Sequence, residues 1–259
     1  MCMMKKVLGM VTVLALSVSL LAGCGSTAAS PVSSAASTAA ESTTSSVVSE
    51  ATSAAADENA AAAAQLLNDL TGSYQELWPV ILADEYKQTW LDDCTALVGE
   101  DNAEAAFEKL SSMVTGDVYG EDAVKAYANG GGAYFCGFTN DLATLTFDGE
   151  ASTISGTDKD GNELFSHPYH YIGMEPVRGL YEFESDDADS GEFTYFFLAP
   201  DTSAETYHIE FRYGSDADAL SQYDAGDYAY WLASGISTDC DQTMIDNCIE
   251  LFCTENLAG

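Results

Sequence analysis

Residues 196–237 read FFLAPDTSAETYHIEFRYGSDADALSQYDAGDYAYWLASGIS, and this stretch decides the fold. From Thr206 to Tyr213 within it, polar residues alternate with aromatic and aliphatic ones. A period of two is typical of a strand that buries one face. His208 belongs to the polar set, so we expect it to point away from the aromatic face. Pro200 ends the preceding strand, Glu192–Leu198, because proline cannot donate a ladder hydrogen bond. The two strands are expected to form a hairpin with a wide loop.

Short strands also dominate the rest of the second half of the chain. They are predicted at Ala133–Phe138, Leu142–Phe147, Ala151–Ser155, Glu163–Ile172, Gly179–Glu184 and Asp227–Leu232, in addition to the two above. Asp148-Gly149 and Asp160-Gly161 predict tight hairpins, because this dipeptide tolerates the positive φ of such turns. Many closely spaced antiparallel strands favour a β-barrel over an α/β sheet.

Apolar residues at helical spacing predict helices on both sides of these strands. They cover Leu66–Ile81 with an interruption near Gly72, Ala103–Val114, Ala123–Tyr127 and Met244–Phe252. Thr238, Asp239 and Asp241 are available to cap the last helix, in which Cys248 reads as a core residue. The predicted fold class is therefore mainly β with added helices: an antiparallel β-barrel with N-terminal helices and a C-terminal helix.

The first 59 residues are typical of an exported and tethered protein. Lys5 and Lys6 precede the apolar run Val7–Leu21, and Leu-Ala-Gly-Cys ends at Cys24, which predicts a lipoprotein signal peptide at residues 1–23 and lipidation of Cys24. An uncleaved membrane anchor is the weaker alternative, because the run falls short of the roughly 20 residues that span a bilayer. Residues 24–59 are mostly Ser, Thr and Ala and predict a disordered tether. Residues 60–259 form one domain.

Several motifs in this domain resemble the ZinT family in their order and spacing. The first is LTGSYQELWP at Leu70–Pro79, and the next are YFFLAP at Tyr195–Pro200 and TYHIEFRYG at Thr206–Gly214, followed by a segment rich in Tyr and Trp at Tyr228–Ser237. The resemblance covers about residues 60–237. It implies a calycin-like (lipocalin-like) barrel on the outer side of the cell membrane, a zinc ion bound by three histidines, and delivery of zinc to a metal-uptake transporter.

The chain departs from the family pattern at the zinc ligands that the resemblance implies. The first histidine position holds Phe196, the second holds Thr206, and the third is His208. A rebuilt zinc site would combine His208 with Glu210, which lies on the same strand face, or with His167 and His170 of the Glu163–Ile172 strand. A spacing of three places those two histidines on opposite faces of a regular strand. The alternative is that all of them are ordinary polar positions on a barrel.

Two functions follow from these alternatives. The chain is a metal-binding module that takes part in zinc acquisition with a degraded histidine site, or it is a lipocalin-like module that has lost the metal. The second kind would bind a small ligand at the barrel mouth or serve as a surface interaction module. Tyr207, Tyr228, Tyr230 and Trp231 are the residues expected to line such a cavity, although core packing also explains them.

The net charge and the absence of several sequence motifs argue against other classes of function. The net charge of −34 makes nucleic acid and anionic lipid headgroups poor partners and cations better ones. No G-x-S-x-G elbow, phosphate-binding glycine loop or H-E-x-x-H motif occurs, and we expect no enzyme. The acidic segment Glu184–Glu192 lacks the glutamate of an EF-hand loop and reads as a polar turn.

The number of cysteines is compatible with a disulfide and also with free thiols. Beyond the signal peptide and Cys24, five cysteines remain in a chain predicted to reach an oxidising compartment: Cys94, Cys136, Cys240, Cys248 and Cys253. An odd count leaves at least one thiol free, and the spacing does not indicate which residues pair.

Overall fold

The computed structural model describes residues 58–115, 134–200 and 208–257. The predicted signal peptide, almost all of the predicted tether and the predicted helix at Ala123–Tyr127 lie outside these ranges. The loop that holds Thr206 and Tyr207 lies outside them as well. Within the described ranges, no helix is both long and apolar enough to cross a membrane.

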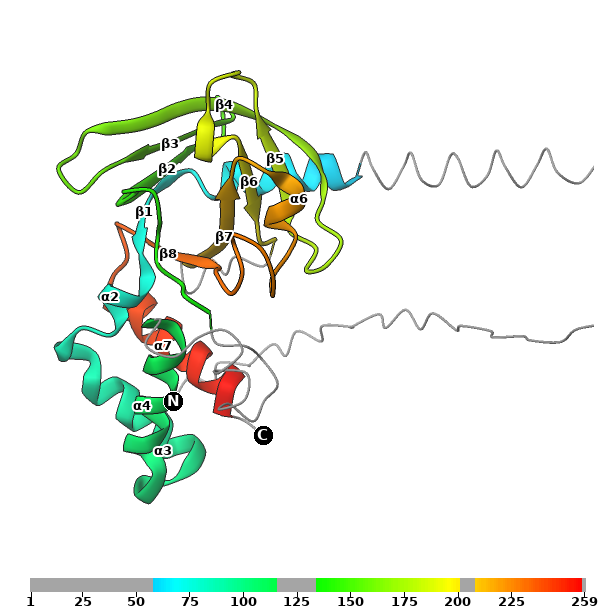
Figure 1. Ribbon diagram of the computed structural model, residues 1–259. Helices are drawn as coiled ribbons and strands as arrows, with labels where there is room; N and C mark the ends of the chain where they lie inside the picture. The colour runs from blue at the N-terminus through cyan, green and yellow to red at the C-terminus, as the bar shows by residue number, and fades with distance from the viewer. Residues whose placement is uncertain (1–57, 116–133, 201–207, 258–259) are drawn as a thin grey trace, which may run out of the picture. The chain divides into compact units, whose positions relative to one another are not determined.

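In the described residues, eight strands close into a barrel in which every neighbouring pair is antiparallel (Figure 1). Consecutive strands pair with each other, and the last returns to the first, with Ser237 opposite Tyr74. This topology confirms the predicted antiparallel barrel. The strands are β1 (Gly72–Glu76), β2 (Thr144–Asp148), β3 (Thr153–Thr157), β4 (Glu163–Met174), β5 (Tyr181–Ser185), β6 (Tyr195–Leu198), β7 (His208–Gly214) and β8 (Ala233–Ser237).

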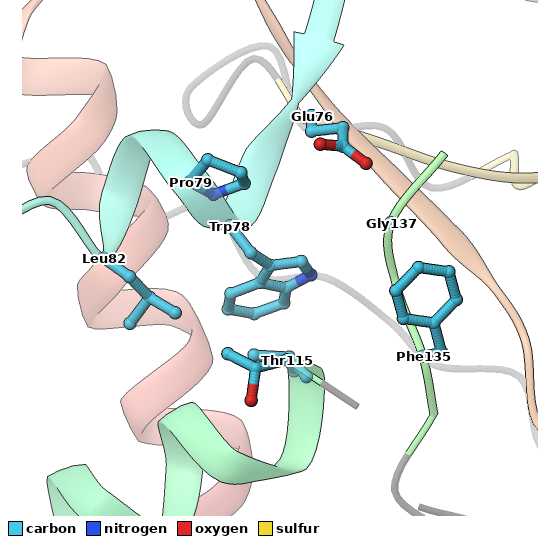
Figure 2. Close-up of a pocket in the computed structure, with 8 residues that line it drawn as sticks. Glu76, Trp78, Pro79, Leu82, Thr115, Phe135 and Gly137 are labelled. Atoms are coloured by element: carbon cyan, nitrogen blue, oxygen red, sulfur yellow. The ribbon is translucent and has the colours of Figure 1, made fainter. Parts of the chain in front are cut away.

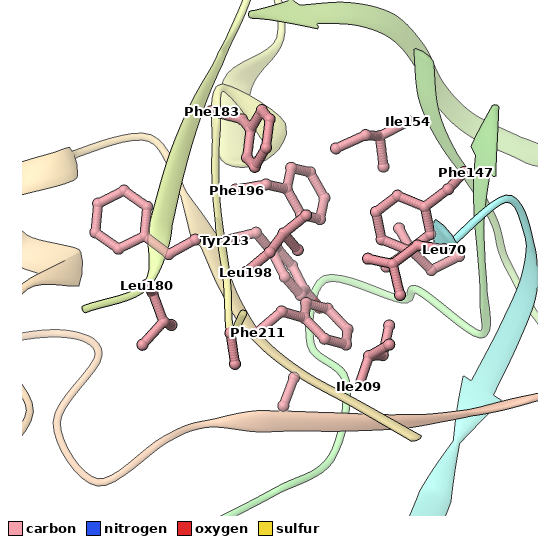
Figure 3. Packing of buried hydrophobic residues seen from close by; sticks show 14 of the residues in the cluster. Leu70, Phe147, Ile154, Leu180, Phe183, Phe196, Leu198, Ile209, Phe211 and Tyr213 are labelled. Carbon is pink, nitrogen blue, oxygen red and sulfur yellow. The ribbon is translucent and has the colours of Figure 1, made fainter. Parts of the chain in front are cut away.

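Aromatic side chains fill the barrel (Figure 3). Phe183, Phe196, Phe211 and Tyr213 are each at most 1% exposed. The ring of Phe196 lies 5.4 Å from that of Tyr213 and 5.5 Å from that of Tyr169, measured between centroids. Each such buried ring contributes roughly 2–3 kcal/mol through the area it removes from water. The interior is thus a packed core, and a ligand site has to lie at the ends or on the outer face of the barrel.

The predicted helix Leu66–Ile81 is wrong in its middle part. A helix occupies residues 58–69, β1 follows at Gly72–Glu76, and α2 begins at Leu77. Gly72 has φ +145°, a conformation that breaks the helix and that residues with a Cβ rarely adopt. Tyr74 then packs inside the barrel, whereas Leu77 packs among the helices. The apolar residues at helical spacing therefore belong to two different cores and do not form one helix face.

The two predicted hairpin turns form, although their glycines act differently. Gly161 has φ +80° in the β3–β4 turn, as expected. In the β2–β3 turn, the positive φ of 50° belongs to Ser152 instead. Gly149 is needed there because a Cβ would lie 2.6 Å from the backbone oxygen of Leu67, at the end of the first helix. Close approach of two backbones, not turn geometry, requires this glycine.

The predicted strands at Ala133–Phe138 and Asp227–Leu232 are wrong as well. They meet only in an isolated bridge between Phe135 and Trp231, and the last strand is β8. Tyr230 has φ +53°, which interrupts an extended chain. The sequence of β8, ASGIS, lacks the aromatic residues that mark a strand. At Gly235 a small residue is favoured, because a Cβ would lie 3.1 Å from Cγ1 of Ile209.

The helices form a second core against the outer side of the barrel. It contains Leu77 of α2 (Leu77–Ile81), Trp90 of α3 (Lys87–Val98), Leu110 of α4 (Glu100–Thr115) and Ile249 of α7 (Gln242–Leu257), together with Ile236 of β8. The helix α7 confirms the predicted C-terminal helix. Its cap is Asp241, whose carboxylate accepts a hydrogen bond of 3.0 Å from the backbone N–H of Met244.

Helix α3 was not predicted, because its apolar stripe is narrow. Only Trp90 and Cys94 of its residues are buried. The indole Nε1 of Trp90 donates a hydrogen bond of 2.7 Å to the carbonyl oxygen of Ile81, which joins α3 to α2. Tertiary contacts therefore stabilise a helix that local patterning alone does not indicate.

Candidate functional site

His208 and Glu210 lie on the outer face of β7, as the alternation predicted. Their partners across the ladder are Ile236 and Ser234 of β8, and both side chains are half-buried. They line a crevice of about 40 Å³ together with Glu255 of α7. The other residues at this crevice are Leu77, Trp78, Ile81, Cys248, Leu251 and Phe252. His208 thus faces the helices, away from the aromatic interior.

Phe196 points the other way, into the barrel. Its ring stacks among those of Phe165, Phe211 and Tyr213, and the residue is fully buried. Because His208 lies on the outer face, a histidine at position 196 would point to the opposite side of the sheet. Thr206 lies outside the described residues. Positions 196 and 208, two of the three carried over from the family, therefore point to opposite sides of the sheet and do not converge on one point.

His167 and His170 point to opposite faces of β4, in agreement with their predicted spacing. His167 stacks near Phe165, with ring centroids 5.9 Å apart, and its Nδ1 lies 2.8 Å from Oδ2 of Asp187. His170 is exposed, and its Nδ1 lies 2.7 Å from Oδ1 of Asp186. The acidic segment after β5 thus forms a turn whose aspartates pair with β4, contacts that the sequence did not reveal.

The four candidate metal ligands fall into separate places. In the barrel order, β5 and β6 lie between β4, with His167 and His170, and β7, with His208 and Glu210. Among the residues that the structure describes, no three His, Cys, Asp or Glu side chains are arranged to hold a metal ion. The residues present in these ranges thus do not fit the three-histidine site that the resemblance implies.

A larger cavity lies beside the end of the barrel, and we name it the Tyr228 cavity. Its volume is about 550 Å³. Its lining residues are Thr115, Phe135, Thr139, Asn140, Glu192, Asp227, Tyr228, Ala229, Tyr230 and Trp231. Tyr228, Tyr230 and Trp231 were predicted to line such a cavity, and the structure brings them together. The carboxylates of Glu192 and Asp227 were not predicted to join them.

Hydrogen bonds position the polar groups of this cavity. The hydroxyl group of Tyr228 donates to Oε2 of Glu192 over 3.1 Å, and Ser215 Oγ donates to Oε1 of the same carboxylate over 3.1 Å. Burial, with the nearby negative charge of Glu192 as a smaller cause, raises the pKa of Tyr228. The phenol therefore stays protonated at neutral pH and keeps donating to Glu192. Indole Nε1 of Trp231 is fixed by a bond of 2.8 Å to the carbonyl oxygen of Gly137.

A second, more apolar cavity adjoins the first. It has a volume of about 330 Å³, and its lining residues are Glu76, Trp78, Pro79, Leu82, Val114, Thr115, Phe135 and Gly137 (Figure 2). The carboxylate of Glu76 is held there as the acceptor for the backbone N–H of Phe138, at 2.5 Å. Thr115 and Phe135 line both cavities, so the two spaces meet around them.

A buried cation holds the loop that forms the Tyr228 cavity. The guanidinium of Arg212, on the outer face of β7, is 0% exposed and donates to the carbonyl oxygens of Leu220, Gln222 and Tyr228. It also lies 4.3 Å from the ring centre of Tyr223. Burial lowers the pKa of Arg212, but a guanidinium remains charged at neutral pH.

These geometries define a class: a closed antiparallel β-barrel flanked by helices, with a packed interior and ligand-sized cavities at its periphery. No family model and no curated protein matches the chain. Among solved structures, it is similar to the zinc-bound ZinT-like domain of AdcA from Streptococcus pneumoniae, with 15% identity, a TM-score of 0.45, and coverage of 71% of this chain and 89% of that one. It is also similar to zinc-bound AdcA from the same organism, with 14% identity, a TM-score of 0.43, and coverage of 72% of this chain and 35% of that one.

Replacing Arg212 by lysine tests how the loop is held. An ammonium group cannot reach three carbonyl oxygens and stack on Tyr223 at once, so we expect Arg212→Lys to lower the free energy of unfolding by about 2–3 kcal/mol. Arg178→Lys is the matched control, because Arg178 is exposed and stacks on the same ring at 4.6 Å. Urea unfolding measures both. Equal midpoints for Arg212→Lys and the wild type would contradict this role.

Proposed function

We propose that this chain is a binding module of the cell envelope that holds a small organic cation in the Tyr228 cavity. The observation that carries the proposal is the meeting of two carboxylates, Glu192 and Asp227, with the rings of Tyr228, Tyr230 and Trp231 around one space. The volume of about 550 Å³ suits a small molecule. The proposal corresponds to the small-ligand alternative predicted from the sequence.

The chemistry of the lining favours an alkylated ammonium group. The faces of aromatic rings attract a cation by about 0.5–2 kcal/mol, more as the cation loses water, and an alkylated ammonium is more easily desolvated than a metal ion. Asp227 and Glu192 add negative charge at the same place. The net charge of −34 attracts any cation to the surface, so selectivity has to come from the rings.

Titration of the full chain with tetramethylammonium chloride, followed by tryptophan fluorescence, tests this proposal. Trp231 lines the cavity and reports on it. We expect a saturable change with a dissociation constant of about 1 mM, weakened about tenfold in Tyr230→Leu and less than about twofold in Tyr230→Phe, since the ring and not the hydroxyl group binds.

Charge is tested in the same assay. Asp227→Asn is expected to weaken binding roughly three- to tenfold, because it removes a carboxylate at the cavity. Asp224→Asn is the matched control, since this exposed aspartate of the same loop does not line the cavity. An equal response to sodium chloride, or the same loss in both variants, would reject the cavity as the site.

Zinc binding on the outer face of β7 is a second candidate. It is favoured by the presence of His208, Glu210 and Glu255 around one crevice, since all three are zinc ligand types. Their described arrangement does not hold an ion, so a site here requires either movement of α7 toward β7 or a ligand from outside the described ranges. By the family resemblance, zinc bound here would be cargo for a metal-uptake transporter.

Calorimetric titration of the full chain with zinc chloride examines the second candidate. If zinc binds in the crevice, His208→Ala removes the heat of binding at micromolar concentrations and His170→Ala retains it. His170 is a suitable control because it is exposed on β4 beside Asp186. Loss of binding in His170→Ala alone, or no heat with the wild type, would eliminate the His208 site.

We also propose that lipid on Cys24 anchors the module to the extracytoplasmic face of the cell membrane. The support is the order of Lys5 and Lys6, the apolar run and the small residues before Cys24. In Cys24→Ala, the chain should leave the processed, membrane-bound form and accumulate as a longer precursor. Cys2→Ala is the control, since Cys2 precedes the apolar run. Unchanged size and fractionation of Cys24→Ala would refute lipidation there.

A further inference from the structure

Two buried cysteines from distant parts of the chain meet in the helical core. Cys94 lies in α3 and Cys253 in α7, and both are 0% exposed. Their sulfur atoms are 4.0 Å apart. Both helices are long enough to hold these positions firmly, and the two residues belong to one core with Trp90 and Ile249. The contact connects segments separated by most of the domain.

We propose that Cys94 and Cys253 form a disulfide that joins α3 to α7 in the exported protein. A bond requires the sulfurs to approach from 4.0 Å to about 2 Å between two helices that pack in one core. Cys136, by contrast, directs its thiol to the carbonyl oxygen of Tyr134 at 3.4 Å, and Cys240 is only partly buried. This inference is independent of the cation site.

The reaction needs an external disulfide as the oxidant. The thiolate of one cysteine attacks this disulfide and forms a mixed disulfide, releasing one thiol. The thiolate of the other cysteine then displaces the second thiol, so that the protein loses two protons and two electrons and the oxidant becomes two thiols. Burial raises the pKa of both cysteines in the folded domain and so disfavours the thiolate that exchange requires there.

The linkage would offset repulsion between the two helices. Asp93, next to Cys94, faces Glu250 and Asp246 of α7, and after burial these charges are the next causes that raise its pKa. Like charges across a helix pair oppose packing. A covalent link there restricts the unfolded chain over a long loop, for which the expected stabilisation is largest. The disulfide would therefore hold α3 and α7 together despite the repulsion between their carboxylates.

Peptide mass spectrometry of the full chain tests the linkage. The chain is recovered from the membrane fraction and denatured in iodoacetamide without reductant. We expect the peptides of Cys94 and Cys253 as one species, two hydrogens lighter than their sum, which reduction separates. The full chain refolded with oxidised glutathione should give the same species. Alkylation of both cysteines without reduction in both preparations would overturn the proposal.

Stability supplies the second measurement. Reductant should lower the Tm of the wild type by roughly 10 °C and leave that of Cys94→Ala unchanged. Cys248→Ala is the matched control, because Cys248 is buried in the same core yet should retain the linked peptides and the shift with reductant. An equal effect of reductant on the wild type and on Cys94→Ala would also overturn the proposal.

Discussion

The guanidinium of Arg212 is a positive charge enclosed by an acidic protein. Its two terminal nitrogens donate to backbone carbonyl oxygens from Leu220 to Tyr228, and its flat face lies over the ring of Tyr223. Without these partners, a charge at 0% exposure would be strongly unfavourable, so the loop has to stay where it is. That position places Tyr228, Tyr230 and Trp231 beside Glu192. Arg212, on the outer face of β7, thus holds the loop that shapes the Tyr228 cavity.

The sequence predicts the barrel well where burial on one face determines the pattern. The alternation around Ile209 and Phe211 gave β7 its correct faces, and the turn at Gly161 formed as expected. The prediction failed where one segment serves two cores, as at Tyr74 and Leu77, and where small residues are required by a neighbouring strand, as at Gly235. Such requirements come from contacts distant in sequence, which a local pattern does not contain.

The sequence likewise predicted some features of the candidate sites and missed others. The shared face of His208 and Glu210 followed from a period of two, whereas the presence of Glu255 beside them depends on how α7 packs on β7. Arg212 belongs to the polar set that alternates with aromatic residues in β7, and the sequence did not indicate that a loop covers it. The pairs formed by Asp186 and Asp187 with the histidines of β4 depend on the path of the chain after β5.

Closure of the barrel has a consequence for how the protein is made. Because β8 supplies the partner of β1, the unpaired edge of β1 has to wait for residues near Ser237. Until then, the growing chain has at most an open sheet, with free edges at β1 and at its most recent strand. Open edges pair readily with other chains, and such distant contacts form slowly. A product shortened before Ala233 would keep both edges and would therefore be prone to aggregation.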